Sequence, residues 1–299
     1  MPVYLLLPLA AAIIYALGSI LIKRALAEGV TMDQSFHLTN FAVGILFIPL
    51  FFFEEKSIEF SALWKPIVMG GTFFVGTWLT FIGIKRGDVS LVTPLMGTKV
   101  VFVALGVVLL TGKVPSFALW VAAFLTAAGI LVMGIADMKK GHHVIFTILI
   151  TLMSAAVFGL CDVLVSWWSP QFGAPTFLAT GSLVVGLLSA ILWLCQGRPN
   201  LHLPKASGKW AWSGAISVGV QAICMGVALS FFNDATGINV VYASRGLWVI
   251  ALVVFLGSAF GNREHHETGR AFFWRVGGTV MLTVAIVIAV VDRAKELST

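Results

Sequence analysis

The chain has 299 residues, of which 59% are hydrophobic and only 11% are charged. Soluble domains are roughly half apolar and about a quarter charged, so this composition excludes an ordinary soluble protein. The net charge of +6 does not indicate a nucleic-acid partner, because membrane proteins collect Lys and Arg in their cytoplasmic loops.

Ten apolar stretches follow one another along the chain, most of them long enough to cross a bilayer core about 30 Å thick as a helix. In chain order they cover residues 3–25, 36–53, 66–84, 89–111, 116–136, 144–168, 174–196, 210–231, 236–258 and 270–291. The first has no basic residue before it and no clear cleavage site after it, so we interpret it as a retained span rather than a signal peptide. We predict an all-α, integral, multi-pass membrane protein with about ten transmembrane helices, located in the bacterial inner membrane.

The polar segment DMKKGHH, residues 137–143, divides these spans into two groups of five. Because five is odd, a second copy of the first group would enter the membrane from the opposite side. We therefore predict two inverted five-helix repeats, residues 1–141 and 142–299. A shift of 146 positions along the sequence supports the repeat, because it places Asp88 over Asp234 and Lys99 over Arg245.

Basic residues are unevenly distributed between the two sides of the predicted bundle. The breaks after the odd-numbered spans hold about eleven Lys and Arg residues, against about five on the other side with the termini included. The positive-inside rule then predicts that these breaks are cytoplasmic and that both termini lie outside.

Two cations lie inside predicted spans, Lys99 near the centre of the fourth and Arg245 near the centre of the ninth. A Lys side chain extends roughly 6 Å, whereas the interface is about 15 Å away, so the ammonium cannot reach it. Insertion of such a residue costs about 2.5–3.5 kcal/mol at a span centre. Each cation is therefore expected to face a partner or a wet cavity inside the bundle.

Two explanations for the cations remain open at this point. We expect Lys99 and Arg245 to face each other across the repeat interface and bind an anionic group of a cargo, with Arg supplying a bidentate fork. The structural alternative pairs them with helix carbonyls or with Asp162, the only carboxylate well inside a span. Asp162 would serve either as their counter-charge or as the site of a coupling proton.

Other polar or aromatic residues inside spans are candidates for contacting the cargo. They are Asn40, Trp78, Gln221, Asn239 and Tyr242. Asn239 and Tyr242 precede Arg245 by six and three residues and would share much of its helical face. Each of the five can also be explained by a hydrogen bond between helices. Pro94 is expected to kink the fourth span shortly before Lys99.

The sequence contains no motif that indicates an enzyme. It has no His-Glu-x-x-His run, no Gly-x-Ser-x-Gly elbow and no Walker-type loop. The histidine pairs at 142–143 and 265–266 have no further metal ligand at a useful spacing. We therefore predict that the protein is not an enzyme and has no metal site or cofactor.

Three stretches resemble the EamA-like transporters of the drug/metabolite transporter superfamily. They are YALGSILIKRALAEG, GIKRGDVSLVTPLMGTKVVFVAL and GINVVYASRGLWVIALVVFLGSAFG. The resemblance covers essentially the whole chain and implies ten helices around a central cavity that opens alternately to either side. In related nucleotide-sugar and sugar-phosphate exchangers, basic residues near the start of span nine resemble Arg245 in position and help bind phosphate.

The sequence departs from related proteins at two places. Many EamA-like proteins carry a Glu just after span four, where this chain has Gly112 and Lys113. Small multidrug exporters use a Glu within span one, and span one of this chain has no acidic residue. These departures argue against proton-coupled export of cationic drugs.

We therefore predict a secondary-active exporter or exchanger of a small organic solute, anionic or zwitterionic, working by alternating access. Its expected partners are that solute, membrane lipid and, where Asp162 titrates, a coupling proton, but no nucleic acid. One alternative is an exporter of neutral or aromatic metabolites, in which the midspan cations are structural and Trp78, Tyr242 and Trp248 contact the cargo. A further alternative is a lipid-handling membrane protein whose cations bind a lipid phosphate.

Overall fold

The computed structural model describes residues 2–53, 60–86, 92, 95–135, 144–256 and 270–296, and these are almost wholly helical. The longer helices are α1 (Leu6–Ala27), α2 (Met32–Leu46), α3 (Trp64–Arg86), α5 (Lys99–Thr111), α6 (Phe117–Ile135), α7 (Val144–Phe172), α8 (Ala174–Cys195), α9 (Gly208–Phe232), α10 (Ala235–Tyr242), α11 (Arg245–Leu256) and α12 (Arg270–Glu296). Short 3-10 turns cover Val3–Leu5, Ile48–Phe53, Phe60–Ala62 and Met96–Thr98. No strand occurs in the described ranges, which confirms the all-α prediction.

Seven helical segments of the described chain are long and apolar enough to cross a membrane, and two shorter apolar helices, Met96–Thr111 and Phe117–Met133, accompany them. The ninth predicted span is divided between α10 and α11. Together these segments account for the ten predicted crossings. The chain is therefore an integral, multi-pass membrane protein of about ten helices.

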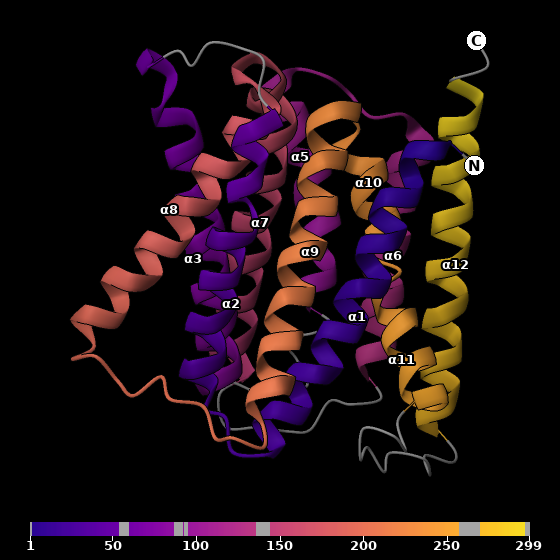
Figure 1. Ribbon diagram of the computed structural model, residues 1–299. Helices are drawn as coiled ribbons and strands as arrows, with labels where there is room; N and C mark the ends of the chain where they lie inside the picture. The colour runs from indigo at the N-terminus through magenta and orange to yellow at the C-terminus, as the bar shows by residue number, and fades with distance from the viewer. Residues whose placement is uncertain are drawn as a thin grey trace.

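Both chain termini lie at the same end of the bundle, which we call the terminus-bearing end (Figure 1). Helix α1 starts there and runs to the opposite end, and α12 returns to it (Figure 1). This placement agrees with an even number of crossings. Which side of the membrane this end faces stays a prediction from the distribution of Lys and Arg.

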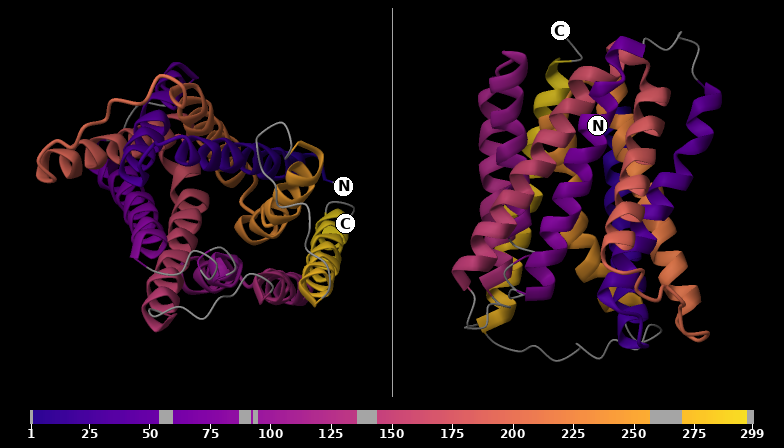
Figure 2. Two further views of the ribbon diagram at one scale, coloured as in Figure 1. Left: turned by 90° about the horizontal axis from the view of Figure 1, so that it is seen from below. Right: turned by 90° about the vertical axis from the view of Figure 1, so that its left-hand side faces the viewer.

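The helices pack in pairs that reach across the proposed repeat boundary. Helix α1 packs along α9, and α3 packs along α7, while α2 contacts α8 and α6 contacts α12. In span numbers these pairs are one with eight, two with seven, three with six and five with ten. If each span of the first half is replaced by the corresponding span of the second half, and the reverse, the same pairs result. Viewed from the end opposite the termini, the helices surround the bundle axis (Figure 2). The division at residue 141 itself stays a prediction.

Small residues allow the closest helix crossings, as is usual where lipid and protein interior are equally apolar. A Cβ at Gly18 of α1 would lie 2.9 Å from Ser217 Cβ of α9. A Cβ at Gly70 of α3 would overlap the Gly181 carbonyl oxygen of α8. These two crossings fix the first half of the chain against the second.

The regular helix is interrupted immediately before each of the two midspan cations. In span four the 3-10 turn Met96–Thr98 ends where α5 begins, at Lys99. In span nine α10 ends at Tyr242, and α11 begins at Arg245 after a two-residue turn. Such interruptions are tolerated inside membranes where the backbone is buried in protein or lines a cavity. Pro94, the expected cause of a kink, lies outside the described residues.

Candidate functional site

The Lys99 ammonium and the Asp162 carboxylate form an ion pair with an Nζ to Oδ2 distance of 2.6 Å. Lys99 is the first residue of α5, and Asp162 lies on α7. The two helices can approach because Gly159, one turn before Asp162, faces α5; a Cβ there would lie 3.0 Å from Phe102 Cβ. The pair is largely buried, with about one eighth of each side chain exposed.

Arg245 is held by two tyrosine rings rather than by an acidic side chain. Its Cζ lies 4.8 Å from the centroid of the Tyr15 ring and 4.8 Å from that of Tyr242. Its Nη1 donates a hydrogen bond to Tyr242 Oη over 3.1 Å. Cations over aromatic rings are stabilised by about 0.5–2 kcal/mol, more when they are desolvated. Among the described residues, no carboxylate lies within ion-pair distance of this guanidinium.

The Tyr242 ring connects the two cations. Lys99 Nζ lies 5.8 Å from its centroid and 5.8 Å from that of Phe158 on α7. The rings of Tyr15 and Tyr242 meet edge to face, with centroids 6.2 Å apart. We call Tyr15, Lys99, Phe158, Asp162, Tyr242 and Arg245 the cation cluster. Spans one, four, six and nine all contribute to it.

The sequence indicated four of these six residues and missed Tyr15 and Phe158. Tyr15 lies in the apolar first span and carries no charge, so nothing in its surroundings marks it. A composition signal was present, because the chain has only 3 Tyr against 23 Phe. A tyrosine in the middle of a span is therefore an unusual choice in this chain. Phe158 has no comparable signal.

The cation cluster carries a net positive charge and lies near the middle of the membrane-spanning helices. It contains two cations and one carboxylate, so one positive charge has no opposite charge within the cluster. Asp162 lies ten residues before the end of α7, and Arg245 ten residues after the start of α10. At 1.5 Å per residue, both lie about 15 Å from the terminus-bearing end.

Asn239 and Gln221 lie in helix interfaces. Asn239 is almost fully buried on α10, and its Nδ2 donates to the Ala235 carbonyl of its own helix over 3.0 Å. Gln221 is buried on α9. It shares the helix face of Gly214 and Ser217, which contact Gly18 of α1.

Asn40 and Trp78 lie on α2 and α3. Asn40 is fully buried, and neither polar atom of its amide has a hydrogen-bond partner in the described part of the chain. Trp78 is 40% exposed. It lies opposite the helix face of Gly76 and Thr80, which contact α7. No hydrogen bond, ion pair or ring contact within the described ranges joins Asn40, Trp78, Gln221 or Asn239 to the cation cluster.

Within the ranges that the structure describes, no group of three or more His, Cys, Asp or Glu side chains could hold a metal ion. Both histidine pairs noted in the sequence lie outside these ranges. The cation cluster provides charged groups and hydrogen-bond donors next to aromatic rings, which suits binding of a ligand. It holds no pairing of nucleophile and base.

Comparison with known proteins agrees with this architecture. Residues 2–135 match the EamA-like transporter family. A solved structure titled "Crystal structure of protein" superimposes with a TM-score of 0.77 over 99% of both chains, at 16% sequence identity. At that identity the likeness concerns the fold alone. No curated protein matches the sequence.

Proposed function

We propose that the chain, whose residues 2–135 match the EamA-like transporter family, is a membrane transporter that carries a small organic anion or zwitterion. In this proposal Arg245 and Lys99 bind the anionic group of the cargo. Asp162 holds Lys99 when the site is empty.

The surroundings of Arg245 carry the proposal. A guanidinium has five N–H donors, and in the described part of the chain Arg245 uses one of them, toward Tyr242 Oη. The two tyrosine rings hold its plane without neutralising its charge. A carboxylate or phosphate would supply both the missing charge and a bidentate acceptor. Arg245 as a whole residue is half-buried.

The ion pair of Lys99 and Asp162 restricts which cargo charges fit the site. With one excess positive charge, the cluster is neutralised by a monoanion and repels a cation. A zwitterion fits as well, since its carboxylate would bind Arg245 while its ammonium competes with Lys99 for Asp162. The Tyr15, Phe158 and Tyr242 rings would flank the apolar part of either cargo.

Alternating access between two inverted repeats is part of the same proposal. Tyr15 and Lys99 come from the first half of the chain, and Phe158, Asp162, Tyr242 and Arg245 come from the second. The helix pairs that survive exchange of the halves support a pseudo-two-fold arrangement. Lys99 and Arg245 correspond under the 146-residue shift, and each begins a helix after an interruption. Interrupted helices at a repeat interface are typical of secondary-transporter sites.

A second candidate function is export of a neutral or aromatic solute. The observation that favours it is that each cation already has partners inside the protein: a carboxylate for Lys99 and two rings for Arg245. In that case the cations are structural, and the aromatic rings bind the solute.

Ligand-induced stabilisation distinguishes the two functions. The detergent-purified protein is heated with anionic, zwitterionic, neutral and cationic metabolites, and its unfolding temperature is recorded. A ligand at a hundred times its Kd adds about 2.7 kcal/mol to the stability of the state that binds it. The responding compounds are then tested for uptake into proteoliposomes, which reports transport itself.

Arg245→Gln and the double variant Lys99→Met/Asp162→Asn remove the charges without leaving a buried ion unpaired. Lys85→Ala is the matched control, because it breaks an exposed ion pair with Asp33, 2.8 Å long, at the end opposite the termini. We expect anions to stabilise the parent and the control but neither charge variant. Equal stabilisation of all four proteins by neutral compounds alone would overturn the anion proposal.

A further inference from the structure

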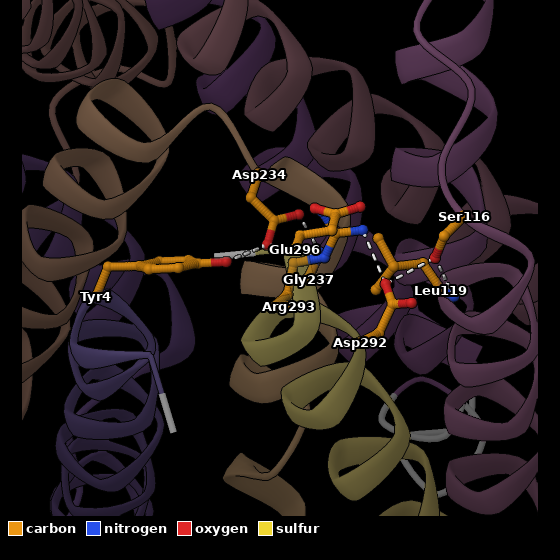
Figure 3. Close-up of polar contacts among 8 residues, drawn as sticks. All are labelled: Tyr4, Ser116, Leu119, Asp234, Gly237, Asp292, Arg293 and Glu296. Atoms are coloured by element: carbon orange, nitrogen blue, oxygen red, sulfur yellow. Dashed lines mark hydrogen bonds and ion pairs between the residues drawn. The ribbon is translucent and has the colours of Figure 1, made fainter. Parts of the chain in front are cut away.

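A second polar network lies at the terminus-bearing end and centres on Asp234 (Figure 3). Tyr4 Oη donates a hydrogen bond to Asp234 Oδ2 over 2.7 Å. The other carboxylate oxygen of Asp234 accepts from Gly237 N over 3.0 Å and so caps the start of α10. Arg293 Nε of α12 lies 3.8 Å from Asp234 Oδ2. One carboxylate thereby contacts the 3-10 turn before α1, the start of α10 and the last turns of α12.

The network extends through α12 to α6. Arg293 Nη2 donates to Asp292 Oδ2 over 2.9 Å, and Nη1 pairs with Glu296. Ser116 Oγ donates to the same Asp292 oxygen over 2.7 Å, and it accepts from Leu119 N at the start of α6. Tyr4 and Ser116, which lie just before α1 and α6 in the first half, thus join a network with Asp234, just before α10, and with Asp292 and Arg293 of α12 in the second half (Figure 3).

Helix α10 connects this network with the cation cluster. Asp234 caps its first turn, and Tyr242 ends it; its eight residues span about 12 Å. Every one of these residues is buried. The helix packs against α1, α5, α6 and α12. Helix α10 therefore separates the cation cluster from the terminus-bearing end.

We propose that Tyr4, Asp234 and Arg293 form a latch that keeps the terminus-bearing end closed. The latch holds the start of α10 against α1 and α12, and it must open before cargo can pass that end. This inference rests on the proposed function, because a route through the protein is needed only in a transporter. The contact between Tyr4 and Asp234 joins the two halves of the chain, and it lies at the bundle end, where water can replace it when the halves separate.

Two conservative variants open the latch while keeping the neighbouring structure. Tyr4→Phe removes the donor but keeps the ring, which stacks on Phe232 with centroids 4.9 Å apart. Asp234→Asn weakens the attraction to Arg293 but retains a side chain that caps helices well. Lys85→Ala is again the control, because its ion pair joins α2 and α3 within the first half.

The reporter is Thr236→Cys, just inside the latch, in a protein whose three native cysteines are replaced. Thr236 is 3% exposed, and its hydroxyl has no hydrogen-bond partner among the described residues, so little else is lost. The protein is placed in nanodiscs, and the rate of labelling by a bulky hydrophilic maleimide is measured. We expect at least fivefold faster labelling with Tyr4→Phe or Asp234→Asn and an unchanged rate with Lys85→Ala.

Cys161 provides the test for general loosening. It is 2% exposed, and its thiol faces the Met69 carbonyl of α3. In a protein that keeps only this cysteine, the latch variants should leave its labelling rate unchanged. Faster labelling of Cys161 as well as of the Thr236→Cys reporter, or no change at the reporter, overturns the latch.

The labelling experiment uses no cargo, so its outcome is independent of the ligand panel. A panel without responding anions would overturn the anion proposal and leave the latch result standing. An unchanged labelling rate at the Thr236→Cys reporter would overturn the latch and leave the anion site standing.

Discussion

Lys99 Nζ and Asp162 Oδ2 lie 2.6 Å apart, and this contact assigns the only midspan carboxylate to one of the two cations. Arg245 is left with the rings of Tyr15 and Tyr242. The assignment follows the chemistry of the two groups. An ammonium is a compact charge that suits a single carboxylate, whereas a guanidinium stacks well on aromatic faces.

The ion pair predicts strong coupling between its two members. Asp162→Asn alone should lower the free energy of unfolding by about 3 kcal/mol, because it leaves an ammonium largely buried without a counter-charge. Adding Lys99→Met should restore most of that loss. Thermal unfolding of the two single variants and the double variant gives the coupling energy. Simple additivity of the two single effects would contradict the pairing.

Tyr15 is predicted to position Arg245 through its ring. Tyr15→Leu should weaken binding of a responding anion roughly fivefold, since a cation–ring contact of this kind is worth about 1 kcal/mol. Tyr15→Phe keeps the ring and should bind like the parent. Titration calorimetry with each variant measures the affinities. Equal weakening by Phe and Leu would assign the effect to the hydroxyl instead.

Arg245→Lys keeps the positive charge but loses the planar fork and much of the stacking on the two rings. We expect anion affinity to fall by at least tenfold, because a Lys cannot bind a carboxylate in the bidentate manner of Arg. Binding measured by calorimetry is compared with that of Arg245→Gln. If the Lys variant bound like the parent, Arg245 would act as a point charge only.

The adjacent glycines Gly70 and Gly71 should respond in opposite ways to alanine. At Gly70 a Cβ would overlap the Gly181 carbonyl of α8, whereas at Gly71 nothing lies within 4 Å. Gly70→Ala should therefore cost about 1–3 kcal/mol by forcing α3 and α8 apart. Gly71→Ala should be neutral or stabilising by up to about 1 kcal/mol through helix propensity. Thermal unfolding in detergent compares the two, and equal effects would contradict the close crossing of α3 and α8.

The two termini should be found on one side of the membrane, and the charge distribution places them outside. In a bacterial host, a C-terminal alkaline phosphatase fusion should be active and a C-terminal green fluorescent protein fusion should be dark. The reverse pattern would invert the orientation and leave the fold unchanged.

Helical periodicity predicted some contacts of the cation cluster and failed for others. Tyr242 does contact Arg245, as their spacing of three residues suggests. Asn239, six residues before Arg245, bonds its own helix instead. Both spacings cross the interruption between α10, which ends at Tyr242, and α11, which begins at Arg245. The spacing of three residues still brings the side chains together across it, whereas the spacing of six does not.

The sequence alone determined the class of the protein, its ten crossings and the three ionised groups that must find partners inside the bundle. These conclusions depend on local hydropathy and on the cost of burying charge, which any stretch of the chain reveals by itself. Only the tertiary structure decided that Asp162 pairs with Lys99, that Tyr15 joins Arg245 and that Tyr4 meets Asp234, 230 residues away. Inside a membrane the lipid-facing and buried sides of a helix are equally apolar, so hydrophobic pattern does not specify which faces meet. Small residues and a few polar contacts between distant segments make that choice.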